Sequence, residues 1–75
     1  MSDEQIERII VTVDNEHLLD IQSVATALQS AGMKVNNVLP ITGIITGEVA
    51  PLKIQELETI PGVVDVEVDR EMQAI

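Results

Sequence analysis

A strict alternation of valine and acidic residues near the end of the chain constrains the fold more than any other feature. From residue 64 to residue 69 each valine is followed by a carboxylate. Because successive side chains of a β-strand point to opposite faces of the sheet, this pattern predicts one apolar face and one charged face. We expect Val64, Val66 and Val68 to face a core, and the other face to carry a row of acids, Asp65, Glu67 and Asp69.

The acidic row lowers the stability of the strand, since like charges on one face repel each other. The repulsion falls if water surrounds the row, or if a partner with positive potential faces it. A solvated face is one interpretation of the pattern, and a docking surface is the other. The strand leads into a short C-terminal segment in which only Arg70 balances the acids.

Three more segments have the composition of strands. Residues 8–14 are rich in β-branched side chains, and residues 33–39 and 42–49 are two further candidates. Pro40 cannot donate to a strand ladder, so it suggests that the second segment is an edge strand or contains a bulge. The two glycines of the third segment either weaken it or mark a place where another backbone comes close.

Two amphipathic helices are predicted between these strands. Apolar residues at helical spacing from 18 to 28 indicate the first helix, with Asn15 or Asp20 as its N-cap and Gly32 as its end. The second helix is expected over residues 51–60, because proline is favoured in a first helical turn and Pro-Gly follows. Its apolar residues fall largely on one side, namely Leu52, Ile54, Leu57 and Ile60.

The order β-α-β-β-α-β predicts an α+β fold, the ferredoxin-like plait, in which two helices cover one face of a four-stranded antiparallel sheet. Right-handed connections leave the other sheet face uncovered. We expect residues 6–71 to form this single domain, with a disordered tail at 1–5 and a C-terminal tail at 72–75. The side chains expected on the uncovered face are Ile10, Thr12, Asp65, Glu67 and Asp69.

Composition excludes several classes of partner. The chain has 75 residues, no cysteine and no aromatic residue, and its formal net charge is -9. Nucleic acids and anionic membranes would be repelled by this charge, and aromatic stacking of bases is impossible. The polar, acidic N-terminus does not resemble a signal peptide, and no apolar run reaches the roughly 20 residues of a membrane helix. We therefore expect a cytoplasmic protein that binds neither nucleic acid nor membrane.

The residue types needed for catalysis are sparse. His17 is the only histidine, and it is expected in the first loop, so no Ser-His-Asp triad is indicated. Asp14, Glu16, His17 and Asp20 could hold a weakly bound metal ion, but acids near a helix start are more often caps or solvated charges. We therefore expect no enzymatic activity, no cofactor and no metal site.

Two segments resemble a known family. The segment from Gly43 to Val49, and the run Pro-Gly-Val-Val-Asp-Val-Glu-Val-Asp at residues 61–69, look like the subtilisin propeptide-like inhibitors. This family contains the propeptides of subtilisin-like serine proteases and their small free-standing inhibitors. The likeness extends over residues 8–75 and is strongest from residue 43 onward, whereas the first strand and helix are generic for the fold.

The resemblance implies a partner and a set of binding residues. In the family the open sheet face packs on two helices of the protease, and acids at the end of the last strand cap those helices. Glu67 and Asp69 fall on the matching positions. The family's tail lies in the substrate cleft as an extended strand, a role that would fall here to Met72, Gln73, Ala74 and Ile75. The alternative interpretation of this tail is a frayed C-terminus without a binding role.

Two other functions fit the same pattern. A small regulatory domain of this fold could self-associate through its sheet and bind a metabolite between protomers, although fold analogy alone is a weak argument. A relic that kept the fold without inhibitory activity is the other alternative. In each case we expect a monomer or a weak dimer.

Overall fold

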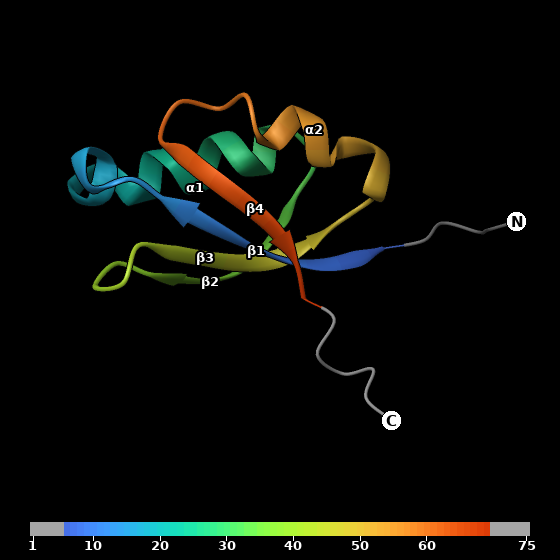
Figure 1. Ribbon diagram of the computed structural model, residues 1–75, viewed down its shortest axis with the longest axis horizontal. Coiled ribbons are helices and arrows are strands. Elements are labelled where there is room, and N and C mark those ends of the chain that lie inside the picture. Colours follow the sequence, from blue (N-terminus) through green and yellow to red (C-terminus); the bar gives the residue numbers. More distant parts are fainter. Residues whose placement is uncertain (1–5, 70–75) are drawn as a thin grey trace, which may run out of the picture.

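The computed structural model describes residues 6–69, which form a four-stranded antiparallel sheet and a helical layer (Figure 1). The strands are β1 (Glu7–Val13), β2 (Lys34–Leu39), β3 (Ile44–Val49) and β4 (Val63–Val68). They lie in the order β2-β3-β1-β4, so β2 and β4 are the two edges. The predicted α+β fold with this sheet and two helices is confirmed.

The helical layer lies on one side of the sheet, as Figure 1 shows. It contains the 3₁₀ helix η1 (Asn15–Asp20), α1 (Ile21–Ser30), the 3₁₀ turn η2 (Pro51–Lys53) and α2 (Ile54–Leu57). Each predicted helix therefore begins with a tighter 3₁₀ segment. No helix within residues 6–69 is long and apolar enough to cross a membrane.

The core lies between the helical layer and the inner face of the sheet. Leu28 of α1, Leu57 of α2, Ile9 and Val11 of β1 and Ile45 of β3 are all 1% exposed or less. The helical stripe predicted for α1 is confirmed by the burial of its apolar residues, Ile21, Val24, Ala25 and Leu28. With no aromatic side chain in the sequence, aliphatic residues fill most of this space.

The apolar side predicted for the second helix is confirmed for three of its four residues. Leu52 does not join the core but is 89% exposed, whereas Leu57 is buried and Ile54 and Ile60 are half-buried. The reason is local geometry. Leu52 precedes Leu57 by five residues, which at 3.6 residues per turn places the two side chains about 140° apart around a helix, so Leu52 points away from the core.

Gly47 marks a close approach of two backbones, as its position in the sequence suggested. It pairs with Val35 of β2, just before the ladder register shifts between Val35 and Asn37. A Cβ atom at Gly47 would collide with the carbonyl oxygen of Lys34. The prediction from Pro40 is also confirmed, because β2 is an edge strand and has this irregularity.

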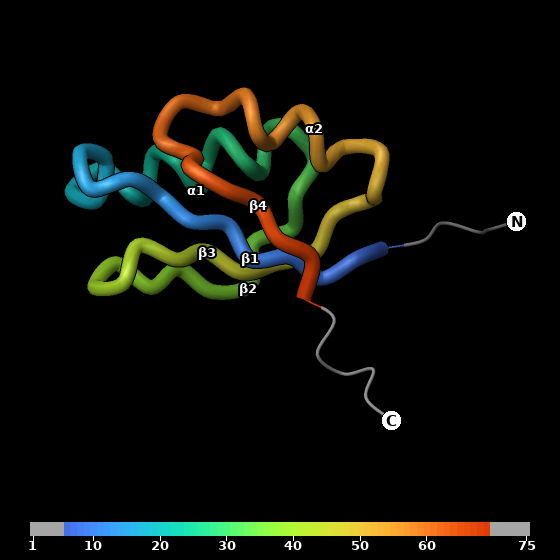
Figure 2. Tube along the Cα trace, in the orientation of Figure 1, coloured from blue at the N-terminus to red at the C-terminus, as the bar shows by residue number. Residues whose placement is uncertain are grey.

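The two ends of the sheet differ. In Figure 2, η1 and the turn between β2 and β3 lie together at one end of the molecule. At the other end, the backbone N–H of Asp69 donates to the carbonyl of Arg8 at 2.9 Å. The start of β1 and the end of β4 are therefore neighbours.

Candidate functional site

The sheet face turned away from the helical layer is the strongest candidate for a functional surface. Its cross-strand rows follow from the register: Glu67, Ile10 and Thr46 form one row, and Asp65, Thr12 and Ile44 form the next. The residues between them on β1 are buried on the helical side. We call this surface the open face, formed by Arg8, Ile10, Thr12, Lys34, Asn37, Leu39, Ile44, Thr46, Glu48, Asp65 and Glu67.

The acids of β4 lie on this surface as the alternation predicted. Asp65 and Glu67 are both exposed, and their cross-strand neighbours on β1 are Thr12 and Ile10 rather than cations. Asp69 follows β4 directly, next to Arg8 at the end of the sheet. The structure therefore brings together four of the side chains expected on the uncovered face, and it places Asp69 at the edge of that group.

Val64 does not lie where the alternation predicted. It was expected to face the core, but its side chain is 60% exposed, and Val63 packs against the core instead. The cause is a register shift: Asp65 lies opposite Thr12, yet Val63 lies opposite Val13, which leaves Val64 as an extra residue. Such a β-bulge bends the strand and increases its twist. Val66 and Val68 face the core side as predicted.

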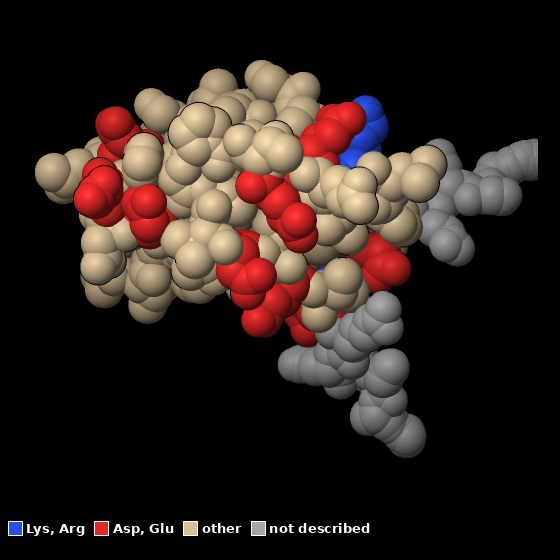
Figure 3. Space-filling model, turned by 45° about the horizontal axis from the view of Figure 1, so that its top comes forward, with Lys and Arg blue, Asp and Glu red and all other residues tan. Residues whose placement is uncertain are grey.

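Positive charge on the open face is confined to one row, in which Glu48 lies between Lys34 and Arg8. The face therefore has a mixed row at one end and acids along β4. Figure 3, turned so that the helical side comes forward, shows several groups of red acidic side chains and little blue on that side of the molecule. The formal net charge of -9 favours partners with basic surfaces.

The four remaining residues proposed for partner binding, Met72, Gln73, Ala74 and Ile75, lie outside the described residues. Their role in a protease cleft is a prediction from the sequence. The last described residue, Asp69, lies beside the open face, next to Arg8.

Sequence reasoning missed the N-cap of the first helical segment. Neither Asn15 nor Asp20 makes a side-chain cap; instead Asp14 Oδ1 accepts the backbone N–H of His17 at 3.0 Å. The ring Nδ1 of His17 lies 2.8 Å from the same oxygen. The spacing Asp-x-x-His at the end of a strand could have indicated this arrangement, because an N-cap side chain accepts from the third residue after it.

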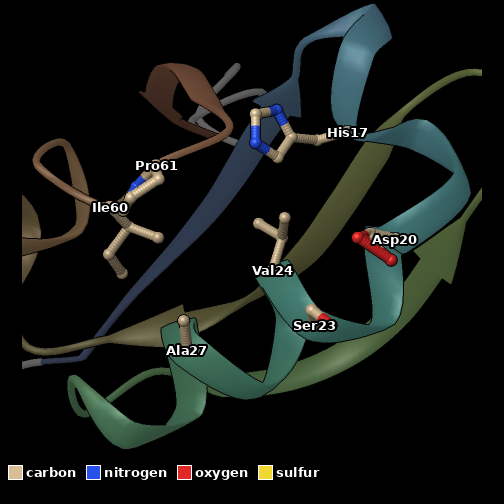
Figure 4. A pocket seen from close by; sticks show the side chains of 7 residues that line it. All are labelled: His17, Asp20, Ser23, Val24, Ala27, Ile60 and Pro61. Atoms are coloured by element: carbon tan, nitrogen blue, oxygen red, sulfur yellow. The ribbon is translucent and has the colours of Figure 1, made fainter.

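An open pocket of about 240 Å³ lies beside His17. Figure 4 shows the His17 ring on one side, Ile60 and Pro61 on another, and the Val24 side chain between His17 and Ser23. The ring fits against the loop because residue 62 is a glycine: a Cβ there would lie 3.0 Å from His17 Cγ. Within residues 6–69, no three His, Cys, Asp or Glu side chains are grouped as metal ligands would be.

The Asp14–His17 contact shifts both protonation equilibria. The hydrogen bond to Asp14 raises the pKa of His17 above its ordinary value of 6.5, and the bond to His17 lowers the pKa of Asp14 below 3.8. A raised histidine pKa stabilises the fold below 6.5 and loses this effect as the pH rises. A lowered aspartate pKa stabilises it above 3.8 and loses this effect as the pH falls. The pair therefore contributes most between these two values.

We expect the Asp14→Asn variant to lower the pKa of His17, since the charged hydrogen-bond acceptor is lost. Titration of the His17 ring proton by NMR measures this change in both proteins. An unchanged, raised pKa in the variant would show that Asp14 is not the cause. Both side chains are more than a third exposed, at 38% and 39%, so water and salt weaken the effect.

The fold and the open face define a small α+β domain whose four-stranded sheet is covered by helices on one side, within residues 6–69. Comparison with protein-family models, curated proteins and solved structures finds no match to the chain. The function is therefore inferred from the surface of the domain itself.

Proposed function

We propose that this chain is a non-enzymatic binding protein that resembles the propeptide-type inhibitors of subtilisin-like serine proteases. In this proposal the domain is a ferredoxin-like plait that docks on the protease through its open face. The observation that supports it most is the combination on one exposed surface of Ile10 and Thr12 with Asp65 and Glu67. Apolar contact area and carboxylates are what a surface needs to pack against helices and cap their ends.

The chemistry of the acids fits such a partner. Helix N-termini present unpaired N–H groups and the positive end of the helix dipole, so carboxylates are favoured there. Glu67 lies in the last part of β4 and Asp69 directly follows this strand. Docking of the pair at two helix ends would also relieve the repulsion along the acidic row.

The second contact of this proposal is made by residues 72–75. Residues 70–75 would span about 20 Å if they were fully extended. This reach would let Met72, Gln73, Ala74 and Ile75 extend from the docked sheet into a neighbouring substrate cleft. There they would pair with the protease as an added strand.

Removal of the last four residues tests this contact. We expect the full chain to inhibit peptide hydrolysis by at least one member of a panel of subtilisin-like proteases, and a chain ending at Glu71 to lose that inhibition. The truncation leaves β4 intact, since this strand ends at Val68. Equal potency of the two chains would reject the tail contact, and inhibition by neither chain would reject the inhibitor function.

A further inference from the structure

The free edge of β4 offers backbone groups for another strand. The N–H of Asp69 donates to the carbonyl of Arg8, so residues 8 and 69 form a hydrogen-bonded pair. Such pairs alternate along an antiparallel ladder, which makes Ile10 with Glu67 the next one. Val66 and Val68 occupy the intervening positions. Their N–H and C=O groups therefore point away from β1, toward the outside of the sheet.

The bulge limits how much of this edge is regular. Val64 is the extra residue at the start of β4, so the evenly paired part of the strand begins at Asp65 and continues to Val68. The opposite edge differs, because β2 has its own register shift, between Val35 and Asn37, and Pro40 follows it. The β4 edge thus offers a short, regular acceptor of about four residues.

Side chains on either side of this edge specify what an added strand must carry. Asp65 and Glu67 are exposed on the open face, while Val66 and Val68 are half-buried on the helical side. A strand added to the sheet continues the same alternation of faces. Its residues on the open face would lie beside carboxylates, and those on the other face beside valines.

We propose that the free edge of β4 binds an extended segment of a partner protein in which lysine or arginine alternates with β-branched apolar residues. The backbone groups of Val66 and Val68 supply the hydrogen bonds, Asp65 and Glu67 select the basic side chains, and the valines contact the apolar ones. This inference concerns the edge of the sheet, and it does not depend on the protease function.

A second copy of this chain is a poor occupant of the same edge. Antiparallel pairing of β4 with another β4 would set acidic side chains beside acidic side chains, which is unfavourable across strands. Each copy also has a net charge of -9. Acids on an edge strand protect it from self-association, and here they leave the edge available to a segment of opposite charge.

An NMR titration tests the edge directly. The probe is a capped peptide, Lys-Val-Lys-Val-Lys, added to the ¹⁵N-labelled full chain at low salt. We expect the amide shifts of Val66 and Val68 to move with saturation, and exchange of their N–H groups with solvent to slow, because these groups become hydrogen-bonded. A capped Glu-Val-Glu-Val-Glu peptide is expected to produce no change.

Two variants separate the roles of charge and backbone. Asp65→Asn with Glu67→Gln is expected to weaken peptide binding by about 2- to 30-fold, the combined range for two cross-strand charge pairs. Val68→Pro removes one outward N–H and is expected to abolish binding. Proline is tolerated at edge positions whose N–H faces solvent, and retained exchange protection of the Glu67 amide checks that β4 is still paired with β1.

Three results would overturn the proposal. The first is no shift at Val66 and Val68 at millimolar peptide, and the second is an equal response to the acidic peptide. The third is a folded Val68→Pro variant that binds the basic peptide as well as the original chain. Protease inhibition is measured separately, so its presence or absence does not alter these outcomes.

Discussion

Replacing Gly47 by alanine is expected to destabilise the domain by about 3 kcal/mol, at the upper end of the usual cost of overpacking. The new Cβ atom would collide with the Lys34 carbonyl oxygen and lie 2.8 Å from Met33 Cε. The methionine side chain can move, but the carbonyl belongs to the backbone of β2. The strand itself must therefore shift away from β3, which disturbs the ladder around the bulge.

The effect is large for a domain of this size. Small domains have free energies of unfolding of roughly 0.05–0.15 kcal/mol per residue, or about 4–11 kcal/mol for 75 residues. Urea denaturation, followed by circular dichroism, measures the loss as a lower midpoint. A Gly47→Ala variant within about 0.5 kcal/mol of the original chain, the usual range for surface substitutions, would contradict the close approach of β2 and β3.

Gly32→Ala is the matched comparison for this variant. Gly32 has a positive φ of 112°, so alanine there is strained, yet its Cβ would find only ordinary contacts, at 3.6 Å or more, with the Lys53 side chain. The cost of this left-handed strain alone is about 1–2 kcal/mol. We therefore expect Gly32→Ala to lose less stability than Gly47→Ala, and the difference reports the backbone collision.

The second large effect is expected at Leu57, whose replacement by alanine should cost about 2–5 kcal/mol. Leu57 is the only buried residue of α2, and it is 0% exposed. Deleting its side chain removes the main apolar anchor of a helix that has a single turn. With no aromatic residue in the chain to fill the space, a cavity should remain beside the sheet.

Leu52→Ala provides a control with the same chemical change a few residues earlier. Leu52 is 89% exposed, so its truncation should change the free energy of unfolding by no more than about 0.5 kcal/mol. Urea denaturation of both variants measures the contrast. Similar losses from the two substitutions would contradict the packing of α2 described here.

The sequence predicted the open face correctly because alternation determines which side chains share a surface. Ile10, Thr12, Asp65 and Glu67 needed only a period of two and the order of the elements. The bulge at Val64 could not be predicted in this way. An extra residue in a ladder depends on the register of two strands far apart in the chain, and a run of two valines contains no sign of it.

The spacing of apolar residues also could not predict the local geometry of the helices. Apolar spacing predicted the helical stripe of α1, but it did not predict the 3₁₀ segments η1 and η2 or the N-cap at Asp14. Hydrogen bonds from i to i+3 and from i to i+4 are compatible with the same residues over one turn. The apolar pattern therefore does not distinguish a 3₁₀ segment from the first turn of an α-helix.

We propose that Glu67 and Asp69 recognise a subtilisin-like protease from the end of the open face. The most direct test of this proposal is the inhibition constant of Glu67→Gln with Asp69→Asn, compared with Glu56→Gln with Glu58→Gln, which removes the same charge from two exposed residues at α2. We expect the first pair to raise the inhibition constant by about 2- to 30-fold for each helix cap removed, and the second to leave it nearly unchanged. Equal constants for both pairs would contradict the claim.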